Sequence, residues 1–237
     1  MRTLTLPQKL AAGLVLAVST AAAFAAAPPT PFTAKYQVLQ GGNAIGEATI
    51  SLKAVGNGEY EYSNQTKGTS GLAAMLGANT DETTRFRWSN DAPETLTYEY
   101  SMKAAIKNKQ RHLKVDSATH QVSVDEGKGV INYTSVPGMV DRNTMPFALG
   151  LALQEGKQSV TLPVGVKQRV EQQQFKVKST ESIKVPAGNF QAERIQRTDA
   201  DKPFDAWYVP QKFPLPVKLS QGDGGNFTLQ LISFSQP

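Results

Sequence analysis

The alternation of apolar and polar residues with a period of two is the feature of this sequence that most constrains its fold. In residues 32–38 every second residue is apolar, and Thr33, Lys35 and Gln37 stand between them. Because a β-strand points successive side chains to opposite faces, this pattern is typical of a strand with one buried and one solvated face. The pattern recurs in residues 48–54, 59–63, 85–89, 96–103, 112–124, 130–136, 159–162, 174–178, 183–185, 190–197 and 226–234.

Turn-forming residues separate the alternating segments. The sequences GGN at 41–43, GNG at 56–58 and VPAGN at 185–189 are rich in Gly and Asn, which tolerate the backbone conformations of tight turns. The run 205–221, which contains three prolines, is interpreted in the same way, as two strands joined by a stiff corner. In its first strand, Trp207 and Val209 are expected to share one face and Tyr208 the other.

Two short apolar segments break the alternation and are predicted to be helices. The first, SGLAAMLGAN at 70–79, begins with Ser70 as a candidate N-cap. The second, DRNTMPFALGLALQEG at 141–156, has Thr144 before Met145 and a proline in its first turn. In this helix Gly150 is unfavourable by about 1 kcal/mol relative to Ala.

These elements predict an all-β fold with two short helices. We expect a curved antiparallel sheet, a half-open β-barrel or β-spiral, with the helices packed in its mouth or on its concave face. Long helices do not separate the strands, so a parallel βαβ architecture is not expected. Residues 26–237 are predicted to form a single β-rich domain.

The first 25 residues have the layout of a secretory signal peptide. Arg2 and Lys9 precede an uncharged apolar segment at 10–24, which is shorter than the roughly 20 residues that span a bilayer. The sequence AFA at 23–25 fits the A-x-A rule for cleavage after Ala25. The chain has no cysteine, so neither a lipid-modified N-terminal cysteine nor a disulfide is possible. We therefore predict residues 1–25 to be a cleaved signal peptide and the protein to be periplasmic and not a lipoprotein.

The charge of the chain is only slightly positive. It contains 25 Lys and Arg residues against 20 Asp and Glu residues, and two of the basic residues belong to the predicted signal peptide. The basic residues are scattered except in KNKQRHLK at 107–114. Such a cluster could contact nucleic acid or anionic lipid, but a solvated strand end explains it as well. We expect no nucleic-acid partner, and the sequence leaves the oligomeric state open.

Residues that usually carry catalysis are scarce in this chain. There are two histidines, His112 and His120, on either side of a predicted hairpin turn, and no G-x-S-x-G or phosphate-loop sequence. The carboxylate pairs at 81–82 and 125–126 lie in polar, turn-like surroundings and are expected to be solvated. We therefore predict no catalytic residues, no metal site and no cofactor. A hydrolase with a Ser-His-Asp triad or two carboxylates remains an alternative.

Four stretches of the chain, in this order, resemble a family of exported bacterial proteins, domain-of-unknown-function family 3108. In that family the middle helix tends to begin with Asp-x-x-Ser, and here Asp141 is present while Thr144 replaces the Ser. The resemblance implies the half-open β-barrel shape of periplasmic lipoprotein carriers, and it implies no activity. The stretches are AKYQVLQGGNAIGEATISL at 34–52, VDRNTMPFALGLAL at 140–153, VPAGNFQAERI at 185–195 and AWYVPQKFPLPVKLSQ at 206–221.

From these observations we expect a non-enzymatic cell-envelope protein that binds an apolar or amphipathic ligand, such as a lipid or acyl chain, on a concave sheet. The alternative is an interaction scaffold with a filled barrel core and an envelope protein as partner, and an envelope hydrolase is less favoured. The candidate cavity-lining residues are Met75, Leu76, Phe147, Leu151, Trp207 and Tyr208.

Overall fold

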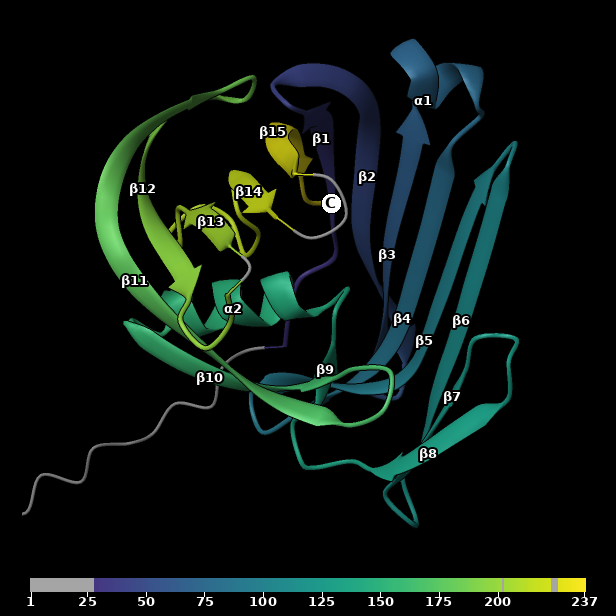
Figure 1. The fold of residues 1–237 in the computed structure, drawn as a ribbon. Helices are drawn as coiled ribbons and strands as arrows, with labels where there is room; N and C mark the ends of the chain where they lie inside the picture. Colours follow the sequence, from purple (N-terminus) through teal and green to yellow (C-terminus); the bar gives the residue numbers. More distant parts are fainter. Residues whose placement is uncertain (1–27, 202, 223–225) are drawn as a thin grey trace, which may run out of the picture.

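The protein forms one continuous curved sheet. The computed structural model describes residues 28–201, 203–222 and 226–237, so the predicted signal peptide lies outside the described residues. Fifteen strands follow one another in the order β8-β7-β6-β5-β4-β3-β2-β1-β15-β14-β13-β12-β11-β10-β9. Figure 1 shows the sheet curling round helix α2 into an open spiral. The predicted all-β fold with two short helices and a curved, barrel-like sheet is confirmed.

The first part of the chain builds one side of this spiral by simple antiparallel hairpins. Each strand from β1 to β8 pairs with the next one along the chain. The elements are β1 (Phe32–Gln40), β2 (Asn43–Gly56), β3 (Glu59–Gly68), α1 (Gly71–Met75), β4 (Asn79–Ser89), β5 (Ala92–Ala104), β6 (Lys107–Asp116), β7 (Gln121–Asp125) and β8 (Val130–Thr134).

The second part of the chain continues the sheet on the other side of β1, with which the last strand, β15, pairs antiparallel. The short strand β9 pairs parallel with β10, and the other neighbours are antiparallel. The elements are β9 (Val140–Asp141), α2 (Met145–Gln154), β10 (Ser159–Gly165), β11 (Val170–Val185), β12 (Gly188–Arg197), β13 (Phe204–Tyr208), β14 (Lys218–Gln221) and β15 (Phe227–Ser235).

The predicted alternation decides which side chains enter the core. In β1 the buried positions are Phe32, Ala34, Tyr36 and Val38, and the residues between them are partly or fully exposed. Rings from several strands then meet at Phe147 of α2, whose centroid lies 5.8 Å from Phe32, 5.8 Å from Tyr62 and 6.2 Å from Phe86. A large aromatic cluster therefore fills the space between the sheet and the helix.

The two helices have opposite environments, and the prediction that both pack inside the sheet is right only for α2. Seven of the ten residues of α2 are buried, whereas α1 has no buried residue. The reason is topological: β3 and β4 are antiparallel neighbours joined by residues 69–78, so a helix in this connection stays at the strand ends. Among the described residues no helix is long and apolar enough to cross a membrane.

Strands β6 to β8 extend past the point where the spiral closes, and we call them the flap. Polar contacts attach the flap to the turn between β10 and β11. The Tyr133 hydroxyl donates to the Val166 carbonyl oxygen at 2.8 Å, and the Lys167 ammonium lies 2.7 Å from the Glu126 carboxylate. Glu126 also pairs with Arg111 of the flap itself. The two ends of the sheet are thus joined by side chains rather than by a strand ladder.

The proline-rich run 205–221 is a hairpin, as predicted, and its second strand, β14, begins at Lys218. Trp207 of β13 lies opposite Lys218 of β14. The connection between them buries Leu215 and Val217 and passes directly over α2. A Cβ atom at Gly150 would lie 2.0 Å from the Pro214 carbonyl oxygen. The glycine that weakens the helix is therefore required by this close contact.

We predict that Gly150→Ala destabilises the protein. Helix propensity alone would stabilise the variant by about 1 kcal/mol. The steric overlap with Pro214 and Tyr208 instead lowers the free energy of unfolding by about 2 kcal/mol. Urea denaturation of the two proteins measures the difference. A variant more stable than the wild type would contradict the tight contact between α2 and the 209–217 connection.

Candidate functional site

The structure does not bring the candidate cavity-lining residues together. Phe147 and Trp207 belong to one buried cluster and Tyr208 to a second one on the other face of β13. The predicted division of faces in β13 is therefore correct. Met75 is 81 % exposed, and with Leu76 it lies at the end of α1, outside the sheet. The expectation that these two residues face α2 across a cavity is wrong.

Trp207 and Tyr208 sit in filled core rather than in a pocket. The Trp207 indole N–H donates to Glu181 Oε2 at 3.0 Å, and the Arg194 and Lys218 cations lie over its ring. The Tyr208 hydroxyl donates to the Pro146 carbonyl oxygen in the first turn of α2 at 2.8 Å. Burial raises the pKa of Tyr208. Both polar groups are satisfied within the protein, so neither is left to receive a ligand.

An open groove of about 310 Å³ runs along one side of α2. Leu151 is the candidate residue that contributes to it. Apolar side chains form its walls, and charged residues stand at its ends. The lining residues are Asp91, Ala92, Pro93, Gly138, Val140, Ala148, Leu151, Ala152, Glu155, Lys157, Ser159, Val160, Thr161 and Leu162.

Two local structures give the groove its charged ends. At one end, Asn90 and Asp91 form the two-residue turn between β4 and β5, with φ angles of 49° and 62°. Asn and Asp are among the residues that tolerate this left-handed conformation best. At the other end, the Lys157 ammonium lies 2.6 Å from Glu155 just after α2. The groove therefore combines an apolar middle with polar ends.

A buried polar junction stands next to the groove, where β9 leads into α2. The Asp141 side chain is fully buried and accepts hydrogen bonds from Thr84 at 3.1 Å and Thr95 at 2.9 Å, on β4 and β5. It also accepts the backbone N–H groups of Asn143 at 2.8 Å and Thr144 at 3.2 Å. Thr144 is the N-cap residue of α2, but its hydroxyl makes no capping bond. The carboxylate thus fixes the start of α2 to the wall formed by β4 and β5.

Neighbouring residues extend the junction. The Asn143 amide donates to Thr84 at 3.1 Å and to the Tyr62 carbonyl oxygen at 3.4 Å, while its own Oδ1 atom is buried without a partner. Arg142 lies 3.4 Å from Glu82, which accepts a 2.6 Å hydrogen bond from the Tyr98 hydroxyl. Every member of this network lies on β3, β4, β5 or the connection itself, so the network acts as a structural joint.

The environment of Asp141 changes its acidity. Burial raises the pKa of this carboxyl group, although the hydrogen bonds from Thr95, Asn143, Thr144 and Thr84 act in the opposite direction. Burial alone would lower the pKa of Arg142, but the nearby Glu82 carboxylate raises it overall. The junction is therefore sensitive to the charge of its central carboxyl group.

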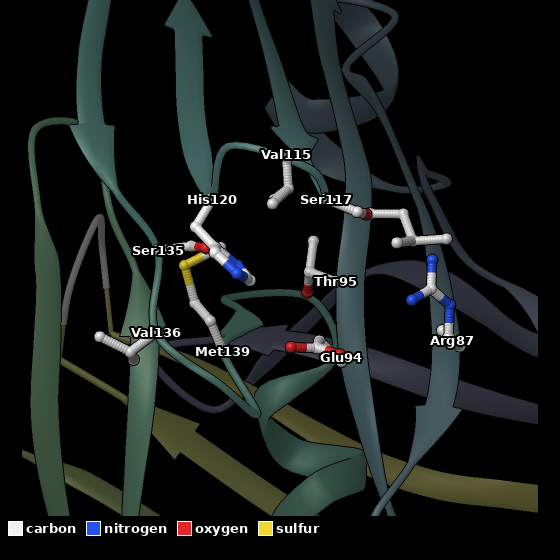
Figure 2. Close-up of a pocket in the computed structure, with 10 residues that line it drawn as sticks. Arg87, Glu94, Thr95, Val115, Ser117, His120, Ser135, Val136 and Met139 are labelled. Atoms are coloured by element: carbon white, nitrogen blue, oxygen red, sulfur yellow. The ribbon is translucent and has the colours of Figure 1, made fainter.

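Figure 2 shows a second hollow, between the flap and β4–β5, which contains His120, Ser117 and Ser135. Its volume is about 60 Å³, which is enough for a few water molecules. Nucleophilic catalysis needs a base within about 3 Å of the hydroxyl. The Ser135 backbone N–H donates to the His120 carbonyl oxygen at 2.7 Å, but within the described residues no hydrogen bond joins the His120 ring to the hydroxyl of either serine. The hollow therefore does not show the contact between a histidine ring and a serine hydroxyl that the hydrolase alternative requires.

The carboxylates behave differently from the sequence prediction. Glu82 was expected in a solvated turn, but it is buried in the middle of β4 and pairs with Tyr98 and Arg142. Glu126 is partly exposed and holds Arg111 and Lys167. In the described part of the chain no group of three His, Asp or Glu residues is placed to bind a metal ion.

Comparison with known proteins places the chain in a family. The family described as protein of unknown function (DUF3108) matches residues 32–231. The chain belongs to the DUF3108 family. No curated protein sequence matches this DUF3108 protein significantly.

Solved structures similar to this DUF3108 protein are distant in sequence. The β-barrel-like protein of domain of unknown function DUF1849 from Brucella abortus is 10 % identical, with a TM-score of 0.55, covering 90 % of this chain and 100 % of its own. This likeness supports the fold alone. A lipoprotein candidate from Parabacteroides distasonis is 11 % identical and covers 88 % of this chain and 96 % of its own, but its TM-score is only 0.32.

Sequence reasoning missed the groove and the junction of this DUF3108 protein. The junction is marked in the sequence by four polar residues at 141–144, which stand between Met139–Val140 and the apolar segment 145–153. Polar residues in such a position are often buried and hydrogen-bonded. The sequence contains no comparable signal for the groove, because alanine, valine and leucine residues look the same in sequence whether they fill a core or line a surface.

We predict that Asp141→Ala strongly destabilises the protein. It removes the shared acceptor of two hydroxyl and two backbone N–H groups, and unpaired buried donors are unfavourable. The expected loss is about 3 kcal/mol in the free energy of unfolding, measured by urea denaturation. Asp116→Ala is the control, because Asp116 accepts two backbone N–H groups in an exposed turn. Equal losses in the two variants would contradict the role of the junction.

The raised pKa of Asp141 predicts a pH-dependent contribution to stability. Since the folded state holds this proton more tightly than the unfolded state, the resulting stabilisation is complete below the unfolded pKa and is lost as the pH rises through the folded pKa. Asp141→Asn cannot titrate. The stability of the wild type relative to Asp141→Asn should therefore fall as the pH rises above the unfolded pKa of about 4, as measured by denaturation at each pH. A difference that grows with pH would show that the ionised carboxylate is the favoured form.

Proposed function

We propose that this protein is an exported, non-enzymatic protein of the cell envelope that binds an apolar or amphipathic ligand, such as an acyl chain, in the groove beside α2. The observation that carries the proposal is the groove itself. Its volume of about 310 Å³ is near the lower end of the range for small-molecule sites, about 300 to 1,000 Å³. Most of its lining side chains are apolar.

The charged ends of the groove favour an amphipathic ligand over a purely apolar one. An alkyl chain would lie between Leu151 of α2 and Leu162 of β10. Both side chains are partly buried and line the groove. A polar head group at either end would meet Asp91 or the Glu155–Lys157 ion pair. Sites for such ligands are mostly apolar, with a few polar groups that fix the orientation.

The proposed location in the cell envelope is inferred from the first 25 residues. Their basic start, uncharged apolar segment and AFA sequence are the features that support a secretory signal peptide. The absence of cysteine from the whole chain excludes an N-terminal lipid anchor on cysteine. The non-enzymatic part of the proposal rests on the lack of a catalytic motif in the sequence.

A second candidate function, an interaction scaffold, is favoured by the packing of the interior. α2 and the rings around Phe147 occupy the space that an open barrel would offer to a ligand. In a scaffold the groove would stay without a small ligand, and an envelope protein would bind the outer surface. The two functions therefore differ in whether the groove binds acyl chains.

Filling the groove tests the proposed function. Thr161 is exposed on β10 and lines the groove, so Thr161→Trp should place an indole ring in it without disturbing the core. Titration with a fluorescent fatty acid should give a dissociation constant at least about tenfold weaker in Thr161→Trp than in the wild type. Thr180→Trp is the matched control, since Thr180 is exposed on β11 and does not line the groove.

The outcomes separate the candidates. Binding that is lost in Thr161→Trp and kept in Thr180→Trp supports the ligand-binding function. A wild-type protein that binds no fatty acid, and that releases no lipid on solvent extraction, contradicts it and leaves the scaffold as the better account.

A further inference from the structure

Exposed apolar side chains gather at one end of the sheet. Leu72 and Met75 of α1 are 65 % and 81 % exposed, and Ile106 in the turn between β5 and β6 is 84 % exposed. Figure 1 shows α1 and this turn at the same end of the sheet. The Ala105 N–H donates to the Leu76 carbonyl oxygen at 2.9 Å, which joins the two segments directly. We call Leu72, Met75 and Ile106 the tip surface.

The backbone holds the tip surface firmly although no side chain of α1 is buried. The Gly68 N–H donates to Ala78 at 2.8 Å, and the Ala78 N–H donates to Ala73 at 2.9 Å. A Cβ atom at Gly68 would lie 2.8 Å from the backbone of Ala73, so the helix packs closely on the end of β3. The exposure of Leu72 and Met75 is therefore part of the folded structure and not the result of a frayed end.

The composition of this end is unusual for a solvated surface. Residues 68–80 contain no charged side chain, although most of them are exposed or half-exposed. Soluble proteins usually cover exposed connections with charged and polar residues, and a cluster of large apolar side chains marks a contact site.

Lysines surround the tip surface on both faces of the sheet. The register places Lys67, Asn79, Lys103 and Asn108 in one row across β3, β4, β5 and β6. Lys107 and Lys109 lie on the opposite face of β6, since they alternate with Asn108.

The ammonium groups of these lysines are available for a partner. All four are exposed, and within the described residues none of them forms an ion pair. Two carboxylates, Glu47 beside Lys67 and Asp81 further along β4, are close in register, so the positive charge prevails.

We propose that the tip surface docks onto an anionic lipid surface. Leu72, Met75 and Ile106 enter the boundary between head groups and acyl chains, while the surrounding lysines bind the anionic head groups. Long lysine side chains can keep their ammonium groups at the level of the head groups while their methylene groups follow the apolar residues inward.

The shape and chemistry of the tip surface favour lipid over a macromolecular partner. Its apolar side chains project from a helix and a two-residue turn, and they line neither the groove beside α2 nor the hollow beside the flap. Projecting apolar residues within a ring of lysines match a layer with anionic groups outside and alkyl chains beneath. A nucleic-acid surface would use the lysines but not the three apolar side chains.

Vesicle binding tests this proposal. The probes are vesicles of phosphatidylcholine alone and vesicles with about one anionic phosphatidylglycerol in three lipids. The protein should begin at Ala26, because the apolar segment 10–24 could itself bind lipid and the described residues from 28 onwards contain all the strands and both helices. We expect binding to the anionic vesicles that weakens when the salt is raised to about 0.5 M.

Two variants and a matched control give the test its specificity. Leu72→Ser/Met75→Ser/Ile106→Ser and Lys67→Gln/Lys103→Gln/Lys107→Gln/Lys109→Gln should each weaken vesicle binding at least about tenfold. Val130→Ser/Ile131→Ser is the control, since these residues are also exposed apolar residues, 59 % and 40 %, but lie on the edge strand β8. The control should bind as the wild type does. All substituted positions are exposed, and thermal unfolding verifies that each variant folds.

Depth of insertion gives an independent readout. In vesicles with brominated acyl chains, the added fluorescence of Met75→Trp should be quenched and that of Val130→Trp should not. Absence of wild-type binding to anionic vesicles overturns the proposal, and so does equal weakening by the Val130/Ile131 control. The groove is at the other end of β5, so Thr161→Trp should keep full vesicle binding even if fatty-acid binding fails.

Discussion

The buried carboxylate of Asp141 is the contact on which the rest of the structure depends. The sheet has two ends, β8 and β9, and β9 has only two residues, too few to close a barrel by strand pairing. Closure instead comes from contacts outside the strand ladders. Thr84 and Thr95 bind Asp141 and hold the connection before α2 against β4 and β5, and the flap contacts the turn between β10 and β11. The same carboxylate accepts the N–H groups that precede α2. One side chain thus links the wall formed by β4 and β5 to the start of the central helix.

The place of α2 in turn determines where a ligand could bind. One side of α2 packs in the aromatic cluster around Phe147. Gly150 allows the 209–217 connection to lie directly on the helix. The concave face is therefore filled, and the open space is left beside the helix, next to β10 and the β4–β5 turn. This barrel-like fold therefore has a groove between α2, β10 and the β4–β5 turn instead of a central cavity.

The strands could be predicted from the sequence because burial alternates along any strand that has one solvent-exposed face, as in β1. It predicted the existence of both helices but not their different environments, since Met75 and Phe147 look equally apolar and only the strand topology separates them. Glu82 was misjudged because its partners Tyr98 and Arg142 are distant in the chain. The groove could not be predicted, because it is formed by segments that meet only after the sheet has curled.

Strand β5 has the groove at its first residues and the tip surface just beyond its last. At about 3.3 Å per residue, its 13 residues separate the two by roughly 40 Å. A molecule standing on a bilayer through the tip surface would hold the groove mouth at that height, facing the aqueous space. In that orientation the length of β5 would determine the distance between the bilayer and a ligand bound in the groove.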